Sequence, residues 1–424
     1  MIKFLLKGLW RDKSRSLLPV MVVASGVFLV VLFHSWISGI MEQSIEYNAR
    51  FSSGHVKIMT TAYAENLHQK PNDLALLGVE DLREELDSMF PEMVWAERII
   101  FGGLVDLPDE NGETRAQGPA MGYGIDLLSG NSAEIERFNI PGSLQSGSIP
   151  EKPGEILISD EFMHKLDAKI GDELTLIGST MYGEMTFYNF TIAGTVKFGA
   201  AAMDKGSIIA DIKDVRMALN MENAAGEILG YFGSGYFEPE LAVNVINRFN
   251  TEFYEDDKPF SPIMISLRDQ DDLGMMVDMA GKMGGILTFI FIVAMSIVLW
   301  NAGILGGLRR YSEFGVRLAI GEEKGHLYKT IVYESLLIGI AGSLLGTLIG
   351  LSLSYYLQNK GIDVGDMMKN ATIMMPSVFK AKVTPVTYVI GFIPGVISTT
   401  FGSMMAGIAI YKRKTARLFK ELET

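Results

Sequence analysis

The chain contains no cysteine among its 424 residues. Neither a disulfide framework nor a thiolate zinc site can form, so any domain outside the cytoplasm must be stable through its own packed core. Histidine is also scarce, since His34, His55, His68, His164 and His326 are the only five and are widely dispersed. This dispersion does not predict a metal site.

Signatures of ATP hydrolysis and enzymatic catalysis are missing as well. The sequence has no glycine-rich loop ending in Gly-Lys-Ser/Thr, no H-E-x-x-H pair and no G-x-S-x-G elbow. The net charge of −13 argues against a nucleic-acid partner. We therefore predict that the chain is not an enzyme, that it binds no cofactor or metal itself, and that any energy from ATP comes from another subunit.

Four long segments without charged side chains organise the chain. Each is long enough for a helix to cross a bilayer core. They lie between Arg15 and Glu42, between Lys282 and Arg309, between Glu334 and Lys360, and between Lys382 and Lys412. The alternative for the first segment is a cleaved signal peptide, but its apolar run exceeds a typical signal core and no A-x-A site follows it. We expect four transmembrane helices.

Basic residues flank these segments on alternate sides and predict the orientation. Clusters precede the first span, separate the second from the third, and follow the fourth, and the positive-inside rule places all three in the cytoplasm of the cell. Both termini are then cytoplasmic in an inner-membrane protein. The clusters are Lys3, Lys7, Arg11, Lys13 and Arg15; Arg309, Arg310, Arg317, Lys324 and Lys329; and Lys412, Arg413, Lys414, Arg417 and Lys420.

The composition, 48% hydrophobic with 21% charged residues, fits a membrane protein that also carries a folded polar domain. The predicted parts, in chain order, are an amphipathic cytoplasmic helix (1–16), a span (17–40), an acidic outer domain (41–280), a second span (281–308), a cytoplasmic loop (309–329), a third span (330–357), an outer loop (358–384), a fourth span (385–411) and a cytoplasmic tail (412–424).

The outer domain mixes two kinds of hydrophobic periodicity. Alternation predicts strands at Glu173–Ile177 and Thr186–Val196, and helical spacing predicts helices at Val79–Met89 and Asp214–Leu219. Turn signals punctuate these elements at Pro108–Gly112, Gly142–Gly147 and Gly178–Gly183. The fold class is therefore a membrane protein with four transmembrane α-helices and a large extracytoplasmic α+β domain inserted between helices 1 and 2.

The cytoplasmic loop after the second span has the spacing of a short helix. Glu313 and Arg317 are expected to pair four residues apart, and Gly321 to end the helix in the left-handed conformation. Phe314 and Leu318 share a face that, if exposed, would form a docking knob for a cytoplasmic partner. A solvated loop with no partner is equally compatible with these residues.

A family resemblance decides between these two interpretations. The run RRYSEFGVRLAIGEEKGHLYKTIVYESLLIGIAGSLLG, residues 309–346, resembles the signature of FtsX-like ABC transporter permeases. The opening KGLWRDKSRSLLPVMVVASGV and the segment PEKPGEILISDEFMHKLDAKIGDELTL, residues 150–176, are similar to other parts of that family. The order of one span, an outer domain and three spans matches its MacB and LolC/LolE type.

The resemblance implies a complex with other subunits. Two permease copies, or this chain and a sister permease, would work with two copies of a separate ABC ATPase that holds ATP and Mg²⁺, while this chain has no nucleotide site. The helix that docks the ATPase would consist of Glu313, Phe314, Gly315, Val316, Arg317, Leu318, Ala319, Ile320 and Gly321.

Two further segments point to a cargo. SGHVKIMTTAYAEN, residues 53–66, and AAMDKGSIIADIKDVRMALN, residues 201–220, resemble the LolC/LolE branch, which implies release of lipoproteins from the inner membrane. Efflux of peptides, toxins or drugs as in MacB is one alternative. A regulatory scaffold that activates a periplasmic hydrolase, as in FtsX, is another.

Two patterns within and near the spans remain. Gly342, Gly346 and Gly350 recur at four-residue spacing and predict close helix packing, although glycine is frequent in membrane helices generally. Methionines before the second span and in the outer loop form an adaptable apolar surface suited to lipid or acyl-chain contact, or simply to helix packing. They are Met275, Met276, Met279 and Met283, with Met367, Met368, Met374 and Met375.

Overall fold

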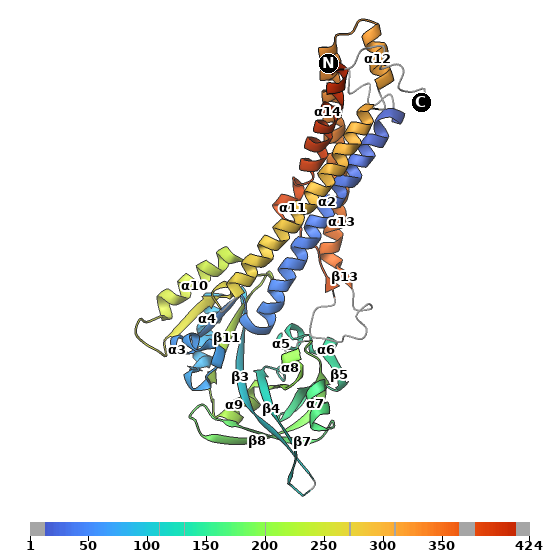
Figure 1. The fold of residues 1–424 in the computed structure, drawn as a ribbon. Coiled ribbons are helices and arrows are strands. Elements are labelled where there is room, and N and C mark those ends of the chain that lie inside the picture. Colours follow the sequence, from blue (N-terminus) through green and yellow to red (C-terminus); the bar gives the residue numbers. More distant parts are fainter. Residues whose placement is uncertain are drawn as a thin grey trace. The chain divides into compact units, whose positions relative to one another are not determined.

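The computed structural model describes residues 13–109, 111–130, 132–199, 201–270, 273–308, 311–363 and 378–412 (Figure 1). The chain divides into a helical unit and an outer unit, the second formed mainly by Ser44–Val277. Residues 1–12 of the expected amphipathic helix, the tail after Lys412 and the outer-loop methionines lie outside the described residues.

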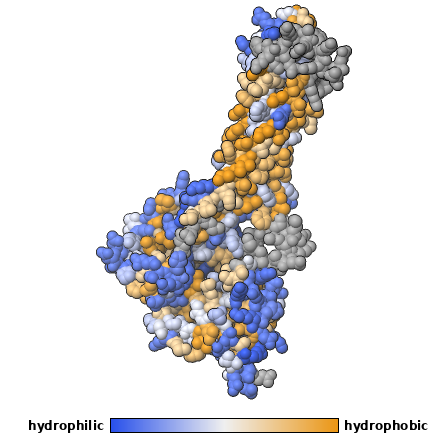
Figure 2. Space-filling model, viewed as in Figure 1, coloured by the Kyte–Doolittle hydropathy of each residue, from blue (hydrophilic) through white to orange (hydrophobic). Residues whose placement is uncertain are grey.

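Four helical segments of the described residues are long and apolar enough to cross a membrane. They are α2 (Lys13–Asn48), α11 (Leu273–Leu308), α13 (Lys324–Lys360) and an irregular segment composed of a 3₁₀ turn (Pro385–Tyr388), a π-helical turn (Ile393–Ser398) and α14 (Thr399–Lys412). Hydrophobic side chains cover most of their visible surface in Figure 2. The expectation of four spans is confirmed, and the first three helices extend beyond the apolar runs that predict them.

The fourth span is irregular because of its prolines. Pro385 occupies the first turn, where Thr384 and Thr387 form a capping box, so its missing N–H costs nothing there. Pro394 lies within the π-helical turn, where it cannot donate the hydrogen bond of a regular helix. The helix then continues as α14.

The outer unit has two lobes that share the 16-residue strand β3 (Met93–Pro108). In the first lobe, β12 (Pro262–Ser266), β1 (Val56–Thr60), β11 (Glu227–Phe232) and β3 pair in that order, all antiparallel. Helices α4 (Val79–Met89) and α10 (Pro239–Phe253) pack on this sheet through a shared apolar core that includes Leu86, Trp95 and Phe249.

In the second lobe the strand pairing closes on itself to form a barrel. Strand β3 pairs with β4 (Thr114–Ile125), and the ring continues through β9 (Ser207–Asp211), β6 (Glu155–Ser159), β8 (Met185–Val196) and β7 (Glu173–Ser179) back to β3. Alternating apolar residues such as Leu174 and Leu176 fill the interior. The strand β5 (Leu144–Gly147) extends β8 outside the ring.

Short elements connect the strands. Helix α9 (Ile212–Leu219) begins at Asp211, whose side chain accepts from the N–H of Lys213 at 2.9 Å. The others are the π turn Ala49–Ser53, α3 (Thr61–Glu65), β2 (Leu76–Leu77), α5 (Glu134–Arg137), α6 (Ile140–Ser143), α7 (Asp160–Leu166), α8 (Ala201–Asp204), β10 (Ala224–Ala225), 3₁₀ turns at Leu67–Gln69, Asn72–Leu74 and Leu267–Asp269, and the short strands β13 (Ile362–Asp363) and β14 (Val378–Phe379).

The expected α+β domain is confirmed, with one local error. The helix predicted at Val79–Met89 is α4, and the predicted strands correspond to β7 and β8. The turn expected at Gly142–Gly147 is instead the end of α6 followed by β5, because the backbone there pairs with the edge of β8.

Candidate functional site

The loop between the second and third spans contains a short helix, α12 (Tyr311–Ala319). Gly321, at φ 101°, ends it: the Gly321 N–H donates to the Leu318 carbonyl at 3.2 Å and the Glu322 N–H to the Arg317 carbonyl at 3.1 Å. This is the Schellman arrangement, in which a left-handed glycine satisfies the last carbonyls of a helix. The prediction that Gly321 ends the helix in the left-handed conformation is confirmed.

The prediction that Phe314 forms an exposed knob is wrong. Phe314 is only 1% exposed and packs with Tyr311, Leu327 and Ile331, while Leu318 is half-buried at the edge of the same cluster. The connection to α13 is short, so the apolar face of α12 folds back onto the first turns of that helix. The Tyr311 hydroxyl also donates to the Ala406 carbonyl of α14 at 2.9 Å.

Exposed apolar side chains lie on the opposite face of α12 and directly after its last residue. Ile320 is 82% exposed and Val316 is 45% exposed. Arg317 donates two hydrogen bonds to Glu322, at 2.7 and 2.8 Å. Glu322 also pairs with His326 at 3.0 Å, which ties the end of α12 to the start of α13. The loop is thus rigidly attached to two spans.

The three regularly spaced glycines lie against α2. A Cβ atom added to Gly342 would lie 2.6 Å from Val23, one added to Gly350 would lie 2.8 Å from Val31, and one added to Gly346 would overlap the Ala24 carbonyl. Distances this short are incompatible with a side chain, so the two helices touch only because these positions are glycine. The contact is within one chain.

The methionines of α11 point outward. Met275, Met279 and Met283 are half or more exposed. The side chain of Met276 lies outside the described residues. The exposed methionines are compatible with the expected apolar contact and do not identify a ligand.

The outer unit holds a buried ionic network that the sequence did not predict. Arg98 on β3 is 2% exposed; its Nε donates to Glu134 at 2.7 Å, and its two Nη atoms donate to the carbonyls of Phe51 and Arg50, each at 2.7 Å. Arg137 also donates to Glu134, at 2.9 Å, so two arginines share this carboxylate. Arg98 therefore satisfies backbone acceptors in the turn that follows α2.

Arg98 and Glu134 both stay charged. Burial opposes the charge on Arg98, yet the attraction of Glu134 outweighs it and raises the pKa of Arg98. Burial likewise would raise the pKa of Glu134, but Arg98 and Arg137 lower the pKa overall. The sequence signal was the presence of two charged residues, Glu97 and Arg98, inside the apolar strand MVWAERII. The partner of Arg98 lies 36 residues away.

A second buried ionic cluster lies in the first lobe, between β1 and β11. Lys57 on β1 and Glu227 on β11 are each about 1% exposed and form an ion pair of 2.8 Å, and Lys70 approaches Glu227 at 2.6 Å. Burial lowers the pKa of Lys57 to about 8 despite the attraction of Glu227. Tyr63 donates to the same carboxylate at 3.4 Å.

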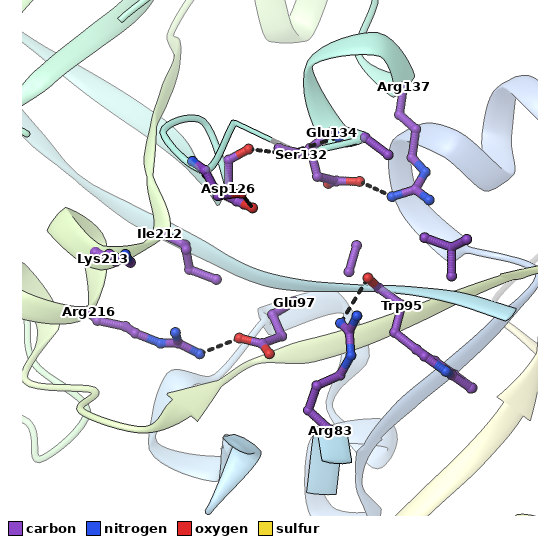
Figure 3. Close-up of a pocket in the computed structure, with 14 residues that line it drawn as sticks. Arg83, Trp95, Glu97, Asp126, Ser132, Glu134, Arg137, Ile212, Lys213 and Arg216 are labelled. Carbon is purple, nitrogen blue, oxygen red and sulfur yellow. Dashed lines mark hydrogen bonds and ion pairs between the residues drawn. The ribbon is translucent and has the colours of Figure 1, made fainter. Parts of the chain in front are cut away.

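The outer unit also has a polar cleft of about 320 Å³ (Figure 3). It is bounded by β3 from Val94 to Glu97, by the loop from Asp126 to Glu134, and by α9. Four basic side chains line it from several sides: Arg83 on α4, Arg137 on α5, and Lys213 and Arg216 on α9. Among the described residues, no group of three or more histidine, cysteine or acidic side chains is arranged to hold a metal ion.

Comparison with known proteins matches both units. Residues 16–274 match the model of the MacB-like periplasmic core domain, and residues 285–415 match that of the FtsX-like permease C-terminal region. Among solved structures, the periplasmic region of MacB from Actinobacillus actinomycetemcomitans is 9% identical, with a TM-score of 0.35, and the match covers 53% of this chain and 92% of that chain. No curated protein gave a match. The chain belongs to the ABC transporter permeases that combine a MacB-like periplasmic core domain with an FtsX-like permease region.

Proposed function

We propose that this chain is the membrane subunit of an ABC machine whose energy comes from a separate ATPase that docks on α12. The observation that carries the proposal is the two-faced character of this helix. Its inner face is fixed by Phe314 and Tyr311, while Ile320 and Val316 remain exposed next to a rigid, capped end. An exposed apolar pair on a fixed support suits the groove of a protein partner.

The attachment of α12 suits it to transmit force. A displacement of the helix would pass to α13 through the Phe314 cluster and the Arg317–Glu322–His326 chain, and to α14 through Tyr311. Two permease copies, or this chain with a sister permease, would then convert ATP-driven closure of two ATPases into motion of the outer domains. On this proposal, α12 and both termini lie in the cytoplasm of the cell.

The cargo we propose is lipoproteins, extracted from the inner membrane. Support comes from the resemblance of residues 53–66 and 201–220 to the LolC/LolE branch, and from exposed Met279 and Met283, whose flexible side chains suit contact with lipid or acyl chains. Efflux of peptides, toxins or drugs is the second candidate, favoured by the match to the MacB-like core domain. A scaffold that activates a hydrolase is the third.

The test is gentle purification of the complex from native membranes in detergent, followed by mass spectrometry of the bound proteins. Recovery of a P-loop ATPase together with acylated lipoproteins supports the proposal and reveals any sister permease. An ATPase with a periplasmic adaptor and no lipoprotein favours efflux. Absence of an ATPase even after cross-linking contradicts the transporter assignment.

The cargo-contact role of the methionines has its own test. Met279→Glu with Met283→Glu should reduce ATP-driven cargo release while the ATPase still copurifies. Met217→Glu is the matched control, because Met217 is equally exposed but lies on α9 of the outer unit. Equal release by the double variant and the control would remove the methionines from the mechanism.

A further inference from the structure

The N-terminal part of β3 has an uncovered edge. On one side, residues 93–98 pair with β11. On the other side, β4 pairs with β3 only from Ile99 onward, and no strand of the described residues continues that pairing toward Val94. The polar cleft lies along this uncovered stretch and is lined by Val94, Trp95, Ala96 and Glu97.

The register shows which backbone groups face the cleft. Trp95 lies opposite Gly230 of β11, and the Gly230 carbonyl accepts from the His55 N–H at 2.9 Å, so Gly230 directs its hydrogen-bonding groups toward β1. Trp95 and Gly230 are therefore a non-hydrogen-bonded pair. The N–H and C=O groups of Trp95, and of Glu97 two residues later, point away from β11 into the cleft.

One of these backbone groups already has a side-chain hydrogen-bond partner. Arg83 Nη1 donates to the Trp95 carbonyl at 2.9 Å. Among the described residues, the Trp95 N–H and the backbone of Glu97 have no such backbone or side-chain partner. The edge thus offers a short row of donors and acceptors beside an open volume, which is what an added strand requires.

The charges around the cleft indicate the character of the added strand. Four basic side chains and three carboxylates line it. Arg216 pairs with Glu97 at 2.6 Å and Arg137 with Glu134 at 2.9 Å, while Asp126 accepts from the N–H of Ser129 in its own loop. Arg83 pairs with Asp87 at 3.2 Å, and exposed Lys213 forms no ion pair within the described residues. The basic side chains of the lining outnumber its carboxylates by one, on an acidic protein.

We propose that this cleft binds an extended, acidic polypeptide segment, which adds to the edge of β3 as a short strand and places a carboxylate near Lys213 and Arg137. Backbone hydrogen bonds to Trp95 and Glu97 supply affinity, and the basic side chains select for negative charge through charge-assisted hydrogen bonds. This site is independent of the cargo assignment, because it recognises peptide backbone and charge.

The test uses the full chain in lipid nanodiscs and three synthetic hexapeptides with blocked ends. The first alternates threonine and glutamate, the second alternates threonine and lysine, and the third is the acidic peptide with alternate amide nitrogens methylated. Fluorescence anisotropy measures binding, and hydrogen exchange measures protection of the Trp95 and Glu97 amides. Lys213→Glu tests the charge, with Lys205→Glu as control because Lys205 is an exposed lysine elsewhere in the outer unit.

The acidic peptide should bind and slow exchange at Trp95 and Glu97, and both effects should weaken about tenfold or more in Lys213→Glu but not in Lys205→Glu. The basic and methylated peptides should bind at least tenfold more weakly than the acidic one. Equal binding of the acidic and basic peptides would overturn the charge selection. Equal binding of the methylated peptide, or unchanged exchange at the β3 edge, would overturn strand addition.

Discussion

Arg98 and Glu134 form a buried ion pair, 2.7 Å from Nε to the carboxylate, and the same guanidinium holds the carbonyls of Arg50 and Phe51. One side chain thus joins β3, α5 and the turn after α2. Arg98 therefore holds the segment that enters the outer unit against the sheet of that unit.

Removing Arg98 should strongly destabilise the outer unit. Arg98→Met leaves Glu134 buried with only Arg137 as partner, removes the Arg98 bond to the Phe51 carbonyl, and leaves the Arg50 carbonyl with the Tyr231 hydroxyl at 3.3 Å. We therefore expect a loss of about 3–5 kcal/mol in the free energy of unfolding. Urea unfolding of the full chain, followed by hydrogen exchange of residues 46–58 and 93–98, measures it. Arg115→Met is the control, since the Arg115–Asp172 pair is exposed and should contribute about 1 kcal/mol or less. Equal losses in the two variants would contradict the role of Arg98.

Because the pKa of Lys57 is lowered to about 8, the free energy of unfolding should depend on pH in the alkaline range. Between pH 8 and 10.5 the folded chain has released the Lys57 proton while the unfolded chain still binds it, so unfolding takes up a proton and stability rises with pH. Relative to Lys57→Met, the native chain should gain up to about 3 kcal/mol across this window and show no relative change from pH 6 to 7.5. Unfolding free energies of both chains at each pH provide the measurement. A constant difference from pH 6 to 10.5 would mean that Lys57 titrates normally.

The two faces of α12 should respond differently to substitution. Ile320→Asp alters a side chain that touches solvent, so the fold should change by less than about 0.5 kcal/mol while the ATPase no longer copurifies. Phe314→Ala removes a buried ring and should cost about 3–5 kcal/mol. Thermal unfolding in detergent and copurification measure the two effects. Retention of the ATPase by a folded Ile320→Asp chain would exclude this face as the docking surface.

The glycine contact between α2 and α13 should not tolerate a side chain. Gly346→Val places a Cβ against the Ala24 backbone, which cannot yield, and should lower the unfolding temperature and the yield of folded protein. Gly285→Val on α11 is the matched control, because a Cβ there meets nothing within 4 Å. Similar behaviour of both variants would show that the helices are able to separate without loss of stability.

Local features of this chain followed from its sequence, and distant contacts did not. The apolar runs indicated the four spans, and α4 was predicted because Leu82 and Leu86 recur on one face. The cap at Gly321 is a similarly local feature. Burial of Phe314 was missed because it depends on how α12 folds back onto α13, which the spacing within α12 does not specify.

The missed elements of the outer unit share one cause. The barrel closes through the pairing of β3 with β7, about 70 residues apart, and alternation alone does not name a strand's partner. Arg98 and Lys57 are charged residues within apolar strands, and their partners come from other elements. The cleft exists because β4 stops pairing at Ile99, which is likewise a property of the assembled sheet.

The two ends of the outer unit are hydrogen-bonded to each other. The Leu267 N–H donates to the His55 carbonyl at 3.1 Å, and the Gln270 side chain donates to the Ser53 carbonyl at 3.0 Å. A domain whose entry and exit strands meet can be inserted into a host chain without stretching it. Residues 54–270 are therefore suited to exchange between related proteins as one unit. A gene fragment that encodes them can replace the equivalent fragment of another permease without separating the ends of the membrane helices that flank it.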